Sequence, residues 1–298
     1  MKHRNAVTPG AGLRLMRFVL LTSLMALTVQ AASFMHVSNG VWSSGYSSAG
    51  TLLATNVPAT VDPHFNLLYT PLGCAGASCT QDGGAPFGGN TYVVQDPGGQ
   101  YPFTGTWLNN DSNSLWLGPR SNQTNPLVGG TAPNVEVFAS NTDFYVYRMV
   151  FDFGSLGLLF NTANIQLSWL SDNNANGNGT LLSHIRLCGI TSANDAVCNA
   201  STAVTSSGNN GQNALSLTPV SIVHGAGNAT FSAGLNALDF IVYNNVVPFG
   251  GNPSGFRVQI TSANADPDPN PPIPEPASLL FISSGLIAVG LYHRKRGV

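Results

Sequence analysis

The sequence predicts an all-β protein whose body is an antiparallel β-sandwich. Three features of the 298-residue chain predict this fold. Apolar and polar residues alternate at a period of two along its central part, clusters of Gly, Asn and Pro separate the alternating stretches, and no internal stretch carries a sustained helical stripe. Apolar runs next to basic residues predict a short hydrophobic helix at each end of the chain.

The alternating stretches are the expected strands. They cover residues 145–153, 165–169, 181–187, 238–242 and 256–260. The expected turns between strands cover residues 172–177, 244–245 and 250–253. Residues 34–100 show less regular alternation, and we expect them to add further strands and a long Gly-rich loop at residues 71–90.

Charged residues make up only 8% of the chain, against roughly 25% in an average soluble domain. The hydrophobic share of 43% is enough for a core, so the sequence is not that of a charge-rich disordered protein. Residues 34–273 hold four arginines, no lysine and twelve Asp and Glu residues, a net charge of −8. This balance excludes nucleic acid as a partner and favours neutral ligands or cations.

Residues 1–31 are expected to be a secretory signal peptide. Arg14 and Arg17 precede a mostly apolar run of twelve residues at 18–29, and small residues flank the expected signal-peptidase cleavage after Ala31. The alternative is a buried core helix. The body is then expected to span residues 32–265.

The C-terminal end has three parts in order: a Pro-rich linker at 266–276, sixteen uncharged residues at 277–292, and a basic tail at 293–298. A helix over the second part would be roughly 24 Å long, short of the ~30 Å hydrocarbon core, although terminal Arg and Lys side chains extend its reach. The basic tail is expected on the cytoplasmic side, with the body outside.

The tripeptide Pro274-Glu275-Pro276, the following helix and the terminal Arg294-Lys295-Arg296 together resemble the PEP-CTERM sorting signal. The resemblance implies processing near the tripeptide by an exosortase, a membrane-embedded cysteine transpeptidase. It also implies a membrane-anchored precursor and a mature protein at the surface or in the extracellular matrix of Gram-negative-type bacteria, often ones that make exopolysaccharide. An ordinary single-pass membrane anchor is the alternative.

The four cysteines form two close pairs along the chain, Cys74 with Cys79 and Cys188 with Cys198. Their spacing does not match zinc knuckles, and export permits disulfides. Two short local disulfide loops are therefore the expected pairing among the three that four cysteines allow, and free cysteines are the alternative.

Residues 100–262 are similar to jelly-roll, galactose-binding-like domains of secreted bacterial proteins. The likeness rests on the order of several motifs: Gly105-Thr106-Trp107, residues 114–119 around Trp116, residues 145–153, Trp169 with residues 172–173, and residues 236–242 and 252–258. It implies a β-sandwich body and carries no catalytic signature.

Two candidate sites follow from side-chain chemistry. Trp107 and Trp116 flank a polar run containing Asn110 and Asp111, which matches the aromatic platform and polar donors of a glycan-binding site; core packing of both rings is the alternative. Asp172 and Asn174 are a candidate calcium site, against the alternative that such loops bond their own backbone. Asp152 and Asp239 are expected to bond loops or to pair with an arginine, Arg148 or Arg257.

No catalytic motif stands out. The sequence lacks a nucleophile elbow, a zinc-protease helix, a P-loop and a convincing carboxylate pair, and His36, His64, His184 and His224 look isolated. We therefore expect a non-enzymatic surface or matrix protein, without a catalytic residue, that binds neutral glycan of the exopolysaccharide. A secreted polysaccharide-acting enzyme with an unrecognised site and a purely structural coat or adhesive protein are the alternatives.

Overall fold

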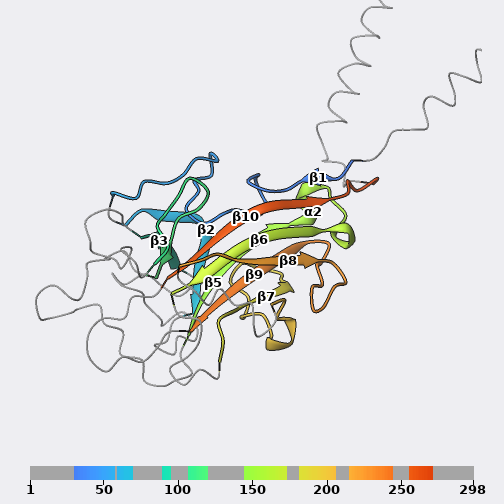
Figure 1. Ribbon diagram of the computed structural model, residues 1–298. Helices are drawn as coiled ribbons and strands as arrows, with labels where there is room; N and C mark the ends of the chain where they lie inside the picture. Colours follow the sequence, from blue (N-terminus) through green and yellow to red (C-terminus); the bar gives the residue numbers. More distant parts are fainter. Residues whose placement is uncertain are drawn as a thin grey trace, which may run out of the picture.

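The computed structural model describes residues 30–57, 59–69, 89–94, 107–119, 144–172, 181–205, 215–243 and 255–270 (Figure 1). The strands in these residues are β1 (Ala32–Ser33), β2 (Val61–Tyr69), β3 (Gly89–Val93), β4 (Leu117–Gly118), β5 (Phe144–Asp152), β6 (Asn164–Ser171), β7 (His184–Gly189), β8 (Thr218–Val223), β9 (Leu235–Tyr243) and β10 (Phe256–Ala265). The helical elements are one turn of α-helix, α2 (Phe153–Leu156), and the 3-10 turns η1 (Phe160–Thr162) and η2 (Ala200–Thr202).

These strands form one sheet in the order β7-β9-β5-β2-β3-β4-β10-β6-β8, and β1 pairs with the end of β10. Every pairing between named strands is antiparallel. We call β7, β9, β5 and β2 the first leaf, and β10, β6 and β8 the second leaf. The short strands β3 and β4 join the two leaves along one side.

Aromatic contacts show that the sheet curls until its leaves face each other. Phe256 of β10 packs on Tyr147 of β5 at 4.3 Å between ring centroids and on Phe240 of β9 at 5.3 Å. Trp169 of β6 lies 5.8 Å from Phe240. None of these strand pairs is a neighbouring pair in the sheet, so the rings meet across the space between the leaves. The main hydrophobic core fills this space.

The alternation predicted for residues 145–153 is seen in β5. Tyr145, Tyr147, Met149 and Phe151 point into the core between the leaves, whereas Val146 and Arg148 belong to the outer face. The all-β, antiparallel expectation is confirmed, and the strands predicted at 145–153, 165–169, 238–242 and 256–260 are present. The strand predicted at residues 181–187 begins three residues later, at His184. Residues 34–100 contribute β2 and β3, as expected.

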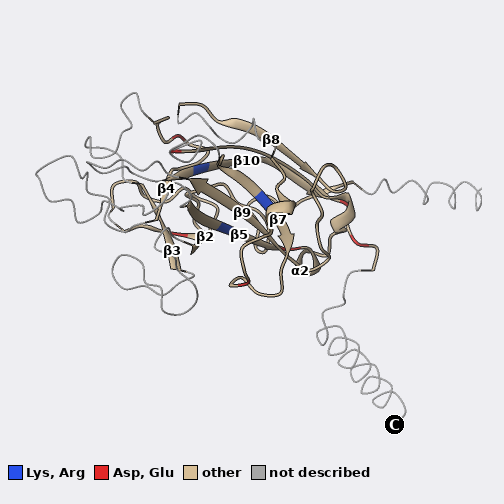
Figure 2. Cartoon of the chain, turned by 90° about the horizontal axis from the view of Figure 1, so that it is seen from below, with Lys and Arg blue, Asp and Glu red and all other residues tan. Residues whose placement is uncertain are grey.

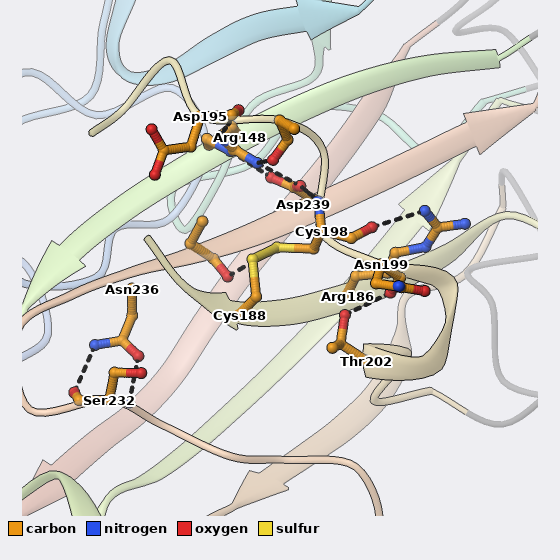
Figure 3. Close-up of a disulfide and its surroundings, with 12 residues drawn as sticks. Arg148, Arg186, Cys188, Asp195, Cys198, Asn199, Thr202, Ser232, Asn236 and Asp239 are labelled. Atoms are coloured by element: carbon orange, nitrogen blue, oxygen red, sulfur yellow. Dashed lines mark hydrogen bonds and ion pairs between the residues drawn. A yellow bond between two sulfur atoms is a disulfide. The ribbon is translucent and has the colours of Figure 1, made fainter. Parts of the chain in front are cut away.

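A loop at residues 190–199 covers the outer face of the first leaf. A disulfide joins Cys188, at the end of β7, to Cys198 in this loop (Figure 3), which confirms that predicted pairing. Cys74 and Cys79 lie outside the described residues. Below the loop, Asp239 of β9 stands opposite Arg148 of β5 in the ladder and pairs with it, as the sequence led us to expect.

A second loop, residues 107–116, covers the outer face of the second leaf. Arg257 of β10 anchors it: the guanidinium donates to Ser114 Oγ at 2.7 Å and to the Asn109 carbonyl at 2.5 Å, and it pairs with Asp111 at 2.5 Å. Figure 2 shows how thinly charge is spread over the described chain, and the buried arginines of both leaves serve to hold loops.

Asp152 has a local role at the end of β5. Its carboxylate accepts from the Gly154 N–H at 2.9 Å and from the Ser155 hydroxyl at 2.6 Å, and so caps α2. The turn then ends at Gly157, whose φ of 63° is left-handed and suits glycine. Residues 1–29, which hold most of the expected signal peptide, and the segments from residue 271 onward lie outside the described residues.

Candidate functional site

The two tryptophans predicted as a glycan platform come together in the structure, but as packed side chains. Trp107 and Trp116 stack at 4.1 Å between ring centroids and are 1% and 0% exposed. Trp107 Nε1 donates to Asp172 Oδ1 at 2.6 Å, and Trp116 Nε1 donates to the Leu108 carbonyl at 2.7 Å. With Val94 and Leu170 they form a small apolar cluster under the 107–116 loop. The geometry favours the core-packing interpretation, because neither ring face is open to a sugar.

The polar residues of that predicted site are built into the loop itself. Asn110 Oδ1 accepts the Trp116 backbone N–H at 2.7 Å. The Asp111 carboxylate accepts from the backbone N–H groups of Asn113 and Ser114. Burial alone would raise the pKa of Asp111, but these hydrogen bonds and the Arg257 guanidinium hold it below its ordinary value. Both side chains therefore stabilise the loop.

Asp172 of the candidate calcium site uses one carboxylate oxygen for the Trp107 indole, and its backbone N–H donates to the Gly255 carbonyl at 2.9 Å. Asn174 lies outside the described residues, so the calcium site stays a prediction. Within the described part of the chain, no group of three or more His, Cys, Asp or Glu side chains gathers as metal ligands would.

His184 lies beside Arg186 on β7, so it is not isolated, which corrects the sequence-based expectation. Arg186 Nε donates to His184 Nε2 at 2.9 Å, and the guanidinium also donates to the Cys198 carbonyl at 2.9 Å. Burial lowers the pKa of His184, which keeps the ring in the neutral form able to accept this hydrogen bond. The pair thus helps to fix the disulfide-closed loop.

His36 and His64 are not isolated, which corrects the sequence-based expectation. Both rings stack on the Trp42 indole: His64 lies at 3.9 Å between centroids with an interplanar angle of 6°, and His36 at 5.3 Å with 19°. Tyr46 packs against His36 at 4.4 Å. We call His36, Trp42 and His64 the three-ring stack.

A tight turn brings the first two rings of the stack together. His36 and Asn39 adopt left-handed φ angles of 55° and 61°. Gly40 has no room for a side chain, because a Cβ there would lie 2.1 Å from the Phe34 carbonyl oxygen. The turn is closed by Trp42 Nε1, which donates to the Val37 carbonyl at 3.1 Å.

Asp62 attaches this N-terminal segment to β2. Its side chain is buried and accepts the backbone N–H of Gly45 at 2.6 Å and of His64 at 2.8 Å. Burial raises the pKa of Asp62 to about 7, against the opposing effect of these hydrogen bonds. Gly45 has a φ of 83°, and a Cβ there would lie 2.4 Å from the Leu115 side chain, so only glycine fits.

His64 is held neutral. Burial lowers its pKa to about 4; a hydrogen bond to the backbone of Ser47 opposes this shift, and the nearby His36 adds to it. His64 Nε2 is buried and has no hydrogen-bond partner in the described structure.

Beside the stack lies a cavity of about 300 Å³, which we call the polar groove. The N-terminal segment contributes Ser38, Asn39, Trp42 and Ser48, β2 contributes His64 and Asn66, and Val150 and Ala193 complete the wall. None of these side chains carries a carboxylate, ammonium or guanidinium group. The volume is at the lower end of the range for small-molecule sites. The lining offers hydroxyl, amide and imidazole groups for hydrogen bonds.

No sequence signal marks the polar groove. His36, Trp42 and His64 share no motif spacing, and their approach depends on the turn at residues 36–40 and on the Asp62 contacts. A search against protein-family models, curated proteins and solved structures found no match for this chain. Among the described residues, none of the helices is long and apolar enough to cross a membrane.

Replacing Trp116 by alanine tests packing against glycan stacking. We expect Trp116→Ala to lower the free energy of unfolding by about 3–5 kcal/mol, because it opens a cavity under the 107–116 loop. Denaturant unfolding of the wild type and the variant measures the effect. A variant of unchanged stability that loses glycan retention would contradict the packing interpretation.

Asp62 predicts a pH-dependent stability. The pKa of this carboxyl is 3.8 in the unfolded chain and about 7 in the folded protein. The stabilisation that its protonated form gives is therefore fully present below pH 3.8 and is lost as the pH rises through about 7. The wild type should therefore lose up to roughly 4 kcal/mol relative to Asp62→Asn across this window. Unfolding curves of both proteins at several pH values measure this difference in the free energy of unfolding. Taking the difference cancels the contributions of other carboxylates, such as Asp111, whose pKa is lowered. A constant difference would contradict the assignment.

Proposed function

We propose that this chain is an exported, non-enzymatic protein of the bacterial cell surface or extracellular matrix, processed at both ends. The observation that carries the proposal is the succession of Pro274-Glu275-Pro276, the uncharged segment 277–292 and the basic Arg294-Lys295-Arg296 at the end of the chain, together with the signal-peptide pattern before Ala31. Signal peptidase and an exosortase are the processing partners in this proposal.

The arrangement of the body's two ends supports this proposal. β1 pairs with the end of β10, with Ala32 opposite Ala265 and Ser33 opposite Asn264 (Figure 1). The residues that follow the signal-peptide site and those that precede the Pro-rich linker therefore leave the sheet side by side.

The disulfide is consistent with export. Disulfides persist in oxidising compartments and are rare in the cytosol. Cys188–Cys198 closes the loop that covers the buried Arg148–Asp239 pair, so the oxidised form helps to keep water away from this ion pair. A body that folds after export gains this covalent closure.

The curled sheet also supports a finer assignment, which we propose with the function: a jelly-roll form of the β-sandwich, similar to galactose-binding-like domains. Its two leaves face each other over an aromatic core, as the layers of a sandwich do. The joining strands β3 and β4 make the two layers continuous along one side, a departure from two separate sheets.

The body's role in this proposal is to contact neutral glycan of an exopolysaccharide matrix. The predicted net charge of −8 over residues 34–273 disfavours anionic partners. A purely structural coat or adhesive protein is the second candidate. The burial of Trp107 and Trp116 favours it over a lectin that would use those two rings.

The intact mass of the protein recovered from the producing cells tests the proposal. We expect loss of the residues up to Ala31 and of the tail that follows Pro274-Glu275-Pro276, with the cysteines oxidised. Glu275→Gln should leave the tail in place and the protein in the membrane fraction. Glu136→Gln, at the only other glutamate of the chain, is the matched control and should be processed normally.

Two results would contradict the proposal. A wild-type protein that keeps residues 277–298 would be a membrane-anchored protein, and the matrix role would fall. A full-length protein in the cytosol would remove export altogether.

A further inference from the structure

β8 is the last strand of the sheet on the side of the second leaf, and among the described residues no strand lies along its outer edge. The other end of the sheet differs. On β7, the Ile185 carbonyl accepts the Val204 N–H at 2.9 Å, and the Ile185 N–H donates to the Thr205 hydroxyl at 3.2 Å. A neighbouring segment thus covers part of that edge. The uncovered edge of β8 offers its backbone donors and acceptors to another chain.

The hydrogen bond that follows β8 shows which of its backbone groups point outward. His224 donates its N–H to the Ala163 carbonyl at 3.0 Å, in the register of the ladder between β6 and β8. In an antiparallel ladder, only alternate residues exchange hydrogen bonds with the neighbouring strand. Val220 and Ile222 therefore hydrogen-bond to β6. The residues whose backbone groups face away from β6 are Pro219, Ser221 and Val223.

These outward backbone groups are not all open to a partner. Ser221 offers both its N–H and its carbonyl, Val223 offers its N–H, and Pro219 offers its carbonyl. Pro219 has no N–H to donate, and the Val223 carbonyl already accepts the Ala226 N–H at 3.0 Å. All three residues are exposed, and none carries a charge that would keep another strand away.

We propose that β8 pairs antiparallel with β8 of a second copy of this chain, about a two-fold axis at Ser221. In this register the two Ser221 residues lie opposite each other and exchange both of their hydrogen bonds. Each Val223 N–H donates to the carbonyl of Pro219 of the partner subunit. Every outward group that is open to a partner is then paired, and the second leaves of the two copies form one continuous sheet.

This register is self-complementary because of the two backbone groups that take no part in it. The missing N–H of Pro219 lies opposite the Val223 carbonyl that the turn already uses, so no donor or acceptor is left unpaired. A shift of two residues in one direction sets Pro219 opposite Ser221 and leaves the Ser221 carbonyl without a donor. The opposite shift directs the Ser221 N–H at the occupied Val223 carbonyl. The two-fold arrangement uses the same edge of both copies and therefore stops at a dimer.

The side chains of β8 keep this pairing compatible with the fold. Val220 and Ile222 belong to the core between the leaves and are not disturbed, whereas Ser221 and Val223 lie on the opposite, exposed face. Few residues take part, so we expect a weak interface of the small, transient class. A high local concentration of the chain would favour it. The proposal rests on the β8 backbone and does not depend on export.

Sedimentation equilibrium of the purified, oxidised protein from roughly 10 μM to 1 mM tests the proposal. We expect a reversible equilibrium between monomer and dimer. Ser221→Lys sets two like charges opposite each other at the two-fold axis and should weaken dimerisation by roughly tenfold or more. Ser48→Lys is the matched control, because this exposed serine lines the polar groove beside residues of β2 and β5. It adds the same charge and should dimerise as the wild type does.

Amide hydrogen exchange of the wild type, followed by NMR at low and high protein concentration, locates the interface. The N–H groups of Ser221 and Val223 should exchange fast in the monomer and become protected as the dimer forms. The N–H groups of Val220 and Ile222 hydrogen-bond to β6 in both states. They are the internal control and should exchange slowly at either concentration.

Circular dichroism and the unfolding midpoint establish that each variant is folded; if Ser221→Lys is not, the exchange of the wild-type amides decides. A monomer up to about 1 mM, or a dimer that Ser221→Lys leaves unchanged, would overturn the proposal. A dimer in which the Ser221 N–H stays unprotected would place the interface elsewhere and overturn it too. Growth into assemblies larger than a dimer would overturn the two-fold register. None of these results bears on export, which the intact mass tests separately.

Discussion

Arg148 has no exposed surface, and a buried guanidinium is tolerated only when its donors are satisfied. Here all five N–H groups have acceptors. Nε and Nη2 donate to the two Asp239 carboxylate oxygens at 2.6 and 2.7 Å, and the remaining donors reach the carbonyls of Ala193, Asp195 and Ala196 (Figure 3). Asp239 also accepts the Cys198 N–H at 2.8 Å. One ion pair thus joins β5, β9 and the disulfide-closed loop.

The second leaf uses the same device in another form. Arg257 is also fully buried and holds the 107–116 loop through Asn109, Asp111 and Ser114. A chain with so few basic residues thus uses its buried arginines to hold loops. Because those loops cover apolar clusters on the outer faces, the curled sheet has three buried layers: the core between the leaves and a smaller cluster on each side.

The sequence placed the strands with clean alternation and gave no bounds for those without it. β2 contains Pro63, which argues against a strand; the structure accommodates it where the register with β3 shifts, between Asp62 and Asn66, and outside the pairing with β5. β8 is short and begins with Thr-Pro, and it does not belong to a long alternating run that would have identified it. The close spacing of Cys188 and Cys198 was enough to predict their pairing, because a loop that short favours local closure.

The candidate site was harder to predict, and the reasons are physical. Aromatic rings beside polar residues look alike in sequence whether they face solvent or pack under a loop, and Trp107 and Trp116 pack. The three-ring stack depends on a left-handed turn at His36 and on a carboxylate buried between two segments. Neither leaves a periodic pattern. The polar groove is a product of tertiary contacts, including the loop that Arg148 holds against it.

The central claim is that the buried ion pair holds the first leaf and its loop together, and a double-mutant cycle tests it most directly. Denaturant unfolding would be measured for the oxidised wild type, Arg148→Met, Asp239→Leu and the double variant. We predict that each single change lowers the free energy of unfolding by about 3–5 kcal/mol, and that the double variant loses clearly less than the sum, because no buried charge is left alone. Additive losses of under about 1 kcal/mol each, as surface ion pairs give, would contradict the account.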